Sequence, residues 1–419
     1  MHIHSPEITA SDGNVTLRAR VKLDGEQGRF PDELWFTVPQ RFEHLFTRGV
    51  EPFVVAASML ASTLDEEIRV DGPFSERLSV GLAEYWKIFA AWSPQKFKPI
   101  RLAARELVSE VQKPGHVAAA FSGGVDSFFT QFAGKDRPPG FRTKYAFFVH
   151  GFDIPLNDDE IFEQAAVNYE AMLLERGVQL VRVKTNARAF IRDWDLGHGS
   201  ALCSVGLALS SGVSRFIVPS SMTYTTLTPW GSTPIADSLL STDQTQMIHD
   251  GASFSRADKL SLMKDWEPLQ AHVRVCYKKP DALHNCGNCI KCRRTMIMLD
   301  ALGVLRNFTT FPPIRTPYHY LACRFQSPHE RLCGRQTIAI AAGNGRKDLA
   351  RIARVAMLAS KLRMATKYLR NLVRPLRRKL FAHDATSRDW RPRIEALHIA
   401  PPAEMQALPA ASVTSLDTL

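Results

Sequence analysis

The chain has 419 residues, of which 45% are hydrophobic and 23% are charged, and its formal net charge is +11. This length allows two or three domains with a large core, and the composition excludes a disordered or fibrous protein. The charge is concentrated in residues 346–393, where fifteen Lys or Arg stand against three Asp, a net of +12. The other residues sum to about −1, so the basicity is local and does not by itself indicate a nucleic-acid protein.

We expect neither a signal peptide nor a transmembrane helix. Its first residues lack a basic stretch followed by an apolar one, and no run of about 18 apolar residues occurs. Seven cysteines in a chain of this length do not form the disulfide framework of a small secreted protein. We therefore expect a cytoplasmic protein without a transmembrane segment.

Residues 1–112 predict a separate α+β N-terminal domain. Apolar and polar residues alternate at period two over 15–23, and 33–38 is a second strand candidate. Helices are expected over 53–62 and 76–92. No recognisable chemistry lies in this segment, so we expect it to pack against the rest of the chain or to shape a substrate site.

Residues 113–312 alternate between strand and helix patterns, which predicts a doubly wound parallel sheet. Ligands bind such sheets beyond the carboxyl ends of the strands, so the segments 122–127, 150–153 and 220–224 are expected to converge. The expected strands are 116–121, 144–150, 178–183 and 215–219, and the expected helices follow residue 127 and cover about 157–176 and 199–211.

The segment Ser122-Gly-Gly-Val-Asp-Ser127 predicts a phosphate-binding loop between a strand and a helix. Two glycines let backbone N–H groups approach a ligand closely, Ser122 adds a hydroxyl, and the helix start presents unpaired amides. A Walker A loop is excluded because no Gly-Lys-Ser/Thr ending is present. The alternative is a plain Gly-Gly turn in which Asp126 and Ser127 cap the helix.

Four cysteines, Cys276, Cys286, Cys289 and Cys292, have the spacing of a zinc site. Two overlapping C-x-x-C pairs let one loop supply three thiolates, and four protein ligands leave no open position, so the zinc would be structural. A set of reduced buried cysteines and a redox pair are the alternatives, and His284 is a possible substitute for one thiolate. The remaining cysteines, Cys203, Cys323 and Cys333, are expected to be ordinary packed residues.

The loop and the cysteines together resemble the PP-loop ATP pyrophosphatases, and within them 7-cyano-7-deazaguanine synthase, over residues 113–312. The resemblance implies ATP, Mg²⁺ and Zn²⁺ as cofactors and an AMP-forming ligase that adenylates a small substrate's carboxylate or carbonyl for attack by ammonia or an amine. The cysteine spacing is one residue longer than expected, residues 229–237 do not match the deazaguanine pocket, and both termini are extended. The ATP site implied by the resemblance is Ser122, Gly123, Gly124, Val125, Asp126 and Ser127, with Asp126 and Ser127 also catalytic.

Four further residues are candidates for the same site. Arg256 and Lys259, near the start of a predicted helix, are comparable to basic residues of the family and are expected to reach the phosphates; a solvated helix face is the alternative. His150 and Asp153, at the end of the second strand of this part, are candidates for a general base or for contacts with Mg²⁺ and substrate. A strand-end turn explains Asp153 nearly as well.

The C-terminal part divides into a basic helical extension, 313–393, and a tail, 394–419, with a disordered composition. The basic stretch 346–393 suits RNA, an acidic partner or a membrane surface, and equally a solvated helix face. The alternative functions are sulfur transfer to tRNA through adenylation, with Cys203 as the nucleophile, and a nucleotide- or RNA-binding module without catalysis. The sequence leaves open whether the chain forms a homodimer.

Overall fold

The computed structural model describes residues 1–25, 28–278, 281 and 283–380. The chain divides into two compact units, Met1–Ala365 and Thr366–Leu419, and the side-chain contacts described belong to the first. The predicted tail, 394–419, and residues 381–393 of the basic extension lie outside the described residues. Within the described ranges, no helix has the length and apolar character needed to cross a membrane.

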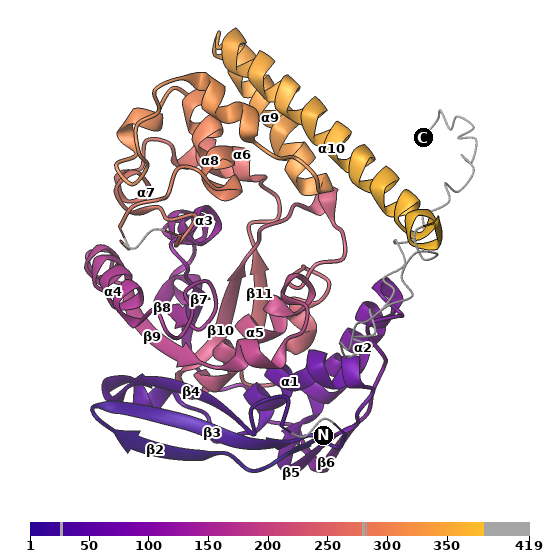
Figure 1. Ribbon diagram of the computed structural model, residues 1–419. Coiled ribbons are helices and arrows are strands. Elements are labelled where there is room, and N and C mark those ends of the chain that lie inside the picture. The colour runs from indigo at the N-terminus through magenta and orange to yellow at the C-terminus, as the bar shows by residue number, and fades with distance from the viewer. Residues whose placement is uncertain (26–27, 279–280, 282, 381–419) are drawn as a thin grey trace, which may run out of the picture. The chain divides into compact units, whose positions relative to one another are not determined.

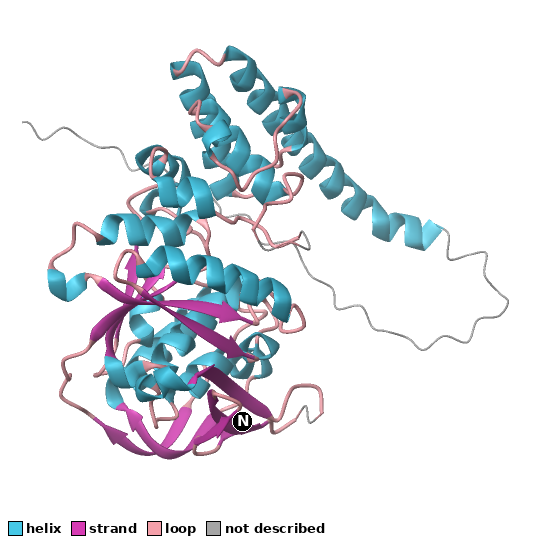
Figure 2. Ribbon diagram, turned by 90° about the vertical axis from the view of Figure 1, so that its left-hand side faces the viewer, coloured by secondary structure: helices cyan, strands magenta, loops and turns pink. Residues whose placement is uncertain are grey.

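The described strands form one eleven-stranded sheet, most of whose pairings are parallel (Figures 1 and 2). Its parallel part has the order β11-β10-β7-β8-β9. The chain runs outward from β7 through β8 to β9 and then crosses to β10 on the other side of β7, so the strand order reverses between β7 and β10. The expected α/β class is confirmed. These strands are β7 (His116–Ala120), β8 (Thr143–His150), β9 (Gln179–Thr185), β10 (Val213–Pro219) and β11 (Gln246–Asp250), the last of which the sequence did not predict.

Strands from residues 1–112 continue the same sheet. Strand β4 (Glu33–Pro39) pairs antiparallel with β9, with Phe36 opposite Thr185 and Thr37 opposite Lys184. The predicted alternation is present in β3 and β4, where every second side chain is buried. The two segments therefore share a sheet, and the division into domains stays a prediction. The other strands are β1 (His2–Ile3), β2 (Glu7–Ser11), β3 (Asn14–Lys22), β5 (Ile68–Ser75) and β6 (Leu102–Val108).

Helices cover both faces of the parallel part. Neighbouring residues of a strand point to opposite faces, so Phe147 of β8 packs in a core with α1 (Glu51–Leu64) and α5 (Trp194–Ala208), while Phe148 packs with α3 (Val125–Gly134) and α4 (Asp159–Leu174). Helix α5 begins at Trp194, five residues before the predicted start at Gly199. The remaining helices are α2 (Glu76–Trp92), α6 (Arg256–Met263), α7 (Glu267–His272), α8 (Ile290–Ala301), α9 (Pro328–Gly343) and α10 (Lys347–Leu380).

The first part of the C-terminal extension packs onto this core. Helix α9 begins with a capping box formed by Ser327 and Glu330. Glu330 also forms an ion pair with Arg294 of α8, with 2.6 Å between the charged atoms. Leu349 and Ala353 of α10 are fully buried in the same cluster as α8. Residues 328–356 therefore pack beside α6 and α8.

Candidate functional site

The predicted loop, Ser122–Ser127, joins the end of β7 to the start of α3, as the sequence indicated. Gly123 has a φ of +71°, a left-handed conformation that favours glycine. A Cβ at this position would lie 1.9 Å from the hydroxyl oxygen of Tyr169, a buried residue of α4. Both the backbone angle and the space therefore require glycine here.

The first amides of α3 have no side-chain cap among the described residues. Gly124 is the N-cap residue, and no described side chain accepts a hydrogen bond from the first turn. Ser127, which is buried, instead closes the loop from inside: its hydroxyl donates to the Gly124 carbonyl at 2.9 Å and accepts from the Ser122 amide at 3.3 Å. The N-terminal amides of a helix lack intrahelical acceptors and carry a partial positive charge. This arrangement is chemically suited to hold an anion such as a phosphate.

Asp126, in the first turn of α3, is paired with both cations of α6. Its carboxylate accepts from Arg256, and its Oδ1 lies 3.0 Å from Lys259 Nζ. Burial alone would raise the pKa of Asp126, but the charges of Arg256 and Lys259 outweigh burial and hold the pKa well below its usual range. The charge of Asp126 in turn raises the pKa of Arg256. The structure thus brings together Asp126, Ser127, Arg256 and Lys259, which the sequence singled out.

Lys259 also connects the loop to the neighbouring strand. Its side chain is 1% exposed, and its ammonium donates to the Ser220 carbonyl, just beyond β10, at 2.5 Å. Ser122 and Ser220 follow β7 and β10, the two strands between which the order reverses. The ammonium therefore lies at the place where open α/β sheets bind their ligands.

Asp250, at the carboxyl end of β11, makes a further link that sequence reasoning missed. Its carboxylate accepts from Thr130 of α3 at 2.7 Å and from Arg137 at 2.6 Å. Strand β11 has only five residues and a mixed burial pattern, so its alternation gave no clear signal. Asp250 fixes α3 against the sheet.

His150 and Asp153 make no contact with the loop among the described hydrogen bonds and ion pairs. His150 is buried, its Nε2 donates to the Pro155 carbonyl at 2.7 Å, and its ring stacks on Phe162. Burial lowers its pKa. Asp153 is exposed and lies 3.8 Å from Lys291, within the cysteine segment. The geometry gives both residues local structural partners, and their role toward a cofactor stays a prediction.

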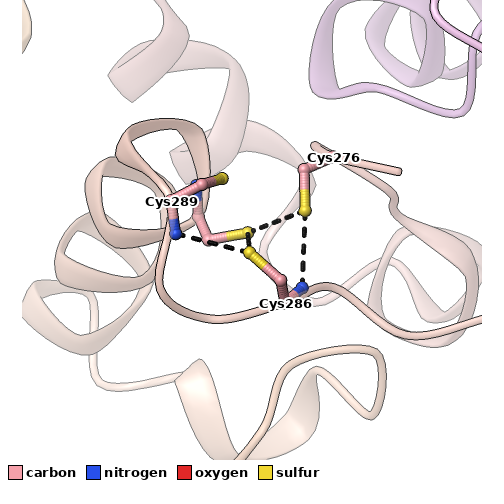
Figure 3. A group of neighbouring side chains, drawn as sticks. Cys276, Cys286 and Cys289 are labelled. Atoms are coloured by element: carbon pink, nitrogen blue, oxygen red, sulfur yellow. Dashed lines mark hydrogen bonds between the residues drawn. The ribbon is translucent and has the colours of Figure 1, made fainter. Parts of the chain in front are cut away.

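The four predicted cysteines form one cluster (Figure 3). All four sulfurs lie within 4.8 Å of one another, with 3.2 Å between Cys276 and Cys292 and 3.7 Å between Cys286 and Cys292. Four sulfurs bound tetrahedrally at about 2.3 Å from a zinc ion would lie about 3.8 Å apart, so the donor set and its size fit zinc. None of the cysteines is in a disulfide. The cluster can hold a metal ion such as zinc.

The environment of the sulfurs also suits thiolates. Backbone amides of the loop point at the sulfurs, from Cys286 to Cys276 at 3.4 Å and from Cys289 to Cys286 at 3.3 Å. Hydrogen bonds from the Cys289 and Cys292 thiols lower the pKa of Cys276, and the same contacts with Cys276 raise the pKa of Cys289 and Cys292, so these three sulfurs favour one shared negative charge. His284 is not a member of the cluster: it is exposed and its ring lies 3.1 Å from the Asp281 carboxylate.

The segment that carries Cys276 contacts the loop directly, which the sequence did not reveal. The Arg274 amide donates to the Gly123 carbonyl at 2.7 Å, and the Tyr277 hydroxyl donates to the Ser122 carbonyl at 2.9 Å. The Tyr277 oxygen also lies 3.1 Å from that of Tyr169. No motif signals these contacts, because they join residues some 150 positions apart.

The other cysteines are packed residues. Cys203 of α5 is fully buried, and burial raises its pKa well above that of an ordinary thiol. Cys323 is also buried, which raises its pKa to about 12. Cys333 of α9 lies 3.9 Å from His329. Cys203 therefore lacks the exposure and the thiolate character of a nucleophile.

Comparison with protein-family models, with curated proteins and with solved structures gave no match. The geometry of the loop and of the cysteine cluster therefore carries the functional argument.

Proposed function

We propose that the chain is an AMP-forming, pyrophosphate-releasing ligase of the PP-loop ATP pyrophosphatase type, with a doubly wound nucleotide domain and a structural zinc. The observation that carries the proposal is the uncapped N-terminus of α3, which follows Ser122–Gly124 directly beyond β7 at the reversal of strand order. The motif and the four-cysteine cluster, which fits zinc, support the same assignment.

In the proposed reaction, a substrate oxygen attacks the α-phosphorus of ATP and pyrophosphate leaves. Ammonia or an amine then displaces AMP from the activated substrate. The amides of Val125 and Asp126 would hold the phosphates, because they are oriented before the ligand arrives and carry no reorganisation cost. Holding ATP and the acid in one site would supply much of the remaining acceleration.

Mg²⁺ is expected to arrive on the triphosphate and not on a preformed protein site. Both carboxylate oxygens of Asp126 are engaged by Arg256 and Lys259. Among the described residues, the groups of three or more potential metal ligands are the four cysteines and the cluster His2, His4 and Asp71. Neither contains a residue of the loop. Arg256 and Lys259 would attract the phosphates electrostatically while they remain paired with Asp126.

The burial of Cys203 removes the best support for sulfur transfer to tRNA, since that reaction needs an accessible thiolate. A small-molecule ligase requires no such residue. The role of residues 346–393 toward RNA or an acidic partner stays a prediction, as does a cytoplasmic location.

The test is incubation of the full chain with α-labelled ATP, Mg²⁺, ammonia and a panel of carboxylic acids, followed by separation of AMP and ADP. We expect AMP and an equal amount of pyrophosphate, and we expect Ser127→Ala to reduce the rate by at least about tenfold, since Ser127 holds the loop closed. Ser5→Ala, at an exposed residue of the N-terminal segment, is the matched control. Formation of ADP in place of AMP would exclude the proposal.

A further inference from the structure

Two carbonyl groups of the candidate phosphate loop are held from the segment that carries the first cysteine. The Gly123 carbonyl accepts from the Arg274 amide at 2.7 Å, and the Ser122 carbonyl accepts from the Tyr277 hydroxyl at 2.9 Å. Arg274 and Tyr277 flank Cys276 in the chain. One short segment, 274–277, therefore holds two successive peptide groups of the loop by hydrogen bonds.

These two contacts determine where the loop amides point. The described chain contains no cis peptide bond, and in a trans peptide the C=O and the next N–H point in opposite directions. The Ser122 carbonyl shares its peptide plane with the Gly123 amide, and the Gly123 carbonyl shares its plane with the Gly124 amide. Holding both oxygens against segment 274–277 turns both N–H groups away from it. Among the described hydrogen bonds, the Gly124 amide makes one long contact, 3.4 Å, to the Ser122 hydroxyl, so it remains suited to a stronger acceptor.

Segment 274–277 is itself held by hydrogen bonds to the cysteine loop. Asn285, next to Cys286, accepts from the Val275 amide at 2.8 Å and from the Cys276 amide at 3.3 Å, and its own amide donates to the Val273 carbonyl at 3.0 Å. Asn285 is fully buried. The Arg274 guanidinium donates to the Cys276 carbonyl at 3.0 Å. The position of segment 274–277 is therefore set by the same loop that gathers the thiols.

Tyr169 of α4 supports the contact between Tyr277 and the loop. Its buried hydroxyl lies 3.1 Å from the Tyr277 hydroxyl, and its ring fills the space where a side chain at Gly123 would stand. The Tyr277 hydroxyl is thus held between a backbone oxygen of the loop and a fixed side chain. It has little freedom to leave the loop unless segment 274–277 moves.

We propose that the four-cysteine centre is a positioning device for the phosphate loop, so that metal bound by Cys276, Cys286, Cys289 and Cys292 raises the affinity of the loop for the phosphates of a nucleotide. Tyr277 and the Arg274 backbone transmit the effect, and Tyr277 is a positioning residue because it acts through the loop. The inference rests on the proposed nucleotide site. Because coupling between two binding sites is reciprocal, a nucleotide must raise the affinity for the metal by the same factor.

The experiment compares ATP binding by the zinc-loaded and the chelator-treated full chain, using calorimetry, and measures zinc extraction by a competing chelator with and without ATP. We expect metal removal to weaken ATP binding about tenfold and ATP to oppose zinc extraction by an equal factor. Hydrogen exchange of the amides in 122–127 should rise when the metal is removed. Equal ATP affinity in both states, or unchanged exchange in the loop, would overturn the inference.

The variant Tyr277→Phe keeps all four cysteines. It tests the contact of segment 274–277 with the loop even if the metal-free chain unfolds. We expect full zinc content, faster exchange in 122–127 and ATP binding weakened about three- to tenfold, since the hydrogen bond from the Tyr277 hydroxyl to the Ser122 carbonyl is lost. Tyr318→Phe, at a residue that is 70% exposed, is the matched control. A Tyr277→Phe chain that binds ATP as the wild type does would refute the role of Tyr277. Absence of ATP binding by the zinc-loaded wild type would instead refute the proposed function, so the two failures are distinguishable.

Discussion

The Lys259 ammonium lies 3.0 Å from the Asp126 carboxylate and is almost completely buried, so the first turn of α3 is tied to α6 by a charge pair. Arg256, one turn earlier on α6, holds the other carboxylate oxygen. A carboxylate in the first turn of a helix would repel an incoming phosphate. Here its charge is compensated by two cations, so the uncapped amides of α3 remain electrostatically open to an anion.

Replacing Lys259 should be strongly destabilising. Lys259→Met keeps the length of the side chain but leaves the Ser220 carbonyl and one Asp126 oxygen without their donor. We expect the free energy of unfolding to fall by about 2–4 kcal/mol, because removing one partner of a buried ion pair leaves uncompensated charge. Urea denaturation followed by circular dichroism measures the loss. Lys87→Met is the control, since Lys87 is 64% exposed and pairs with Glu84 on the surface; an equal loss in both variants would contradict the argument.

The Asp126 pair should also give a defined pH dependence. The folded-state pKa of Asp126 is held below its ordinary value, so its contribution to stability is full above the unfolded-state pKa of about 3.9 and is lost as the pH falls below it. The difference in unfolding free energy between the wild type and Asp126→Asn should therefore begin to shrink as the pH falls below about 5, and it should keep shrinking below pH 3 until the folded-state pKa is passed.

His329 of α9 titrates in the same range and must be separated from Asp126. Burial and the charge of Arg256 lower its pKa to about 4. The comparison is therefore repeated in a chain that also carries His329→Gln. A difference between the wild type and Asp126→Asn that stays constant with pH in both backgrounds would show that Asp126 is not held in its charged form.

Gly123 should tolerate no side chain. Gly123→Ala meets both a left-handed φ and the Tyr169 hydroxyl, 1.9 Å from the new Cβ, so we expect a loss of about 2–5 kcal/mol. Gly177→Ala is the matched control, because its φ of +70° is nearly the same but nothing lies within 4 Å of the new Cβ. That control should lose only about 1–2 kcal/mol, the cost of the left-handed backbone. Thermal unfolding of the two variants measures the difference, and equal losses would exclude the contact with Tyr169.

The strand, loop and helix around Ser122 could be predicted because their signals are local. A buried apolar run, two glycines and a helical pattern follow one another in the sequence, and the cysteines are close enough for their spacing to show a shared ligand site. The contacts of Arg274 and Tyr277 with the loop could not be predicted in this way. They depend on which distant segments pack together, and neither residue type marks such a contact.

The pairing of β4 with β9 was hidden for a similar physical reason. Alternation in β4 shows that one of its faces is buried, but it does not identify the strand that accepts its hydrogen bonds. Helix α5 illustrates a different failure. It is buried on nearly all sides, so it has no polar face whose periodicity would mark a start at Trp194.

The cysteine cluster should bind one zinc ion per chain, and loss of one ligand should abolish stoichiometric binding. Cys276→Ser removes a sulfur that lies 3.2 Å from Cys292, and three remaining thiols close the tetrahedron poorly. We expect its zinc content, measured by mass spectrometry of the purified chain, to fall well below one, with a lower unfolding temperature that added zinc does not restore. Cys203→Ala and His284→Ala should keep full zinc content, because neither residue belongs to the cluster. Loss of zinc in His284→Ala would show that the imidazole is a ligand. Full zinc content in Cys276→Ser would show that Cys276 is not a ligand. Because Cys276 is the residue that joins the cluster to segment 274–277, full zinc content in Cys276→Ser would also remove the physical link between the metal and the phosphate loop.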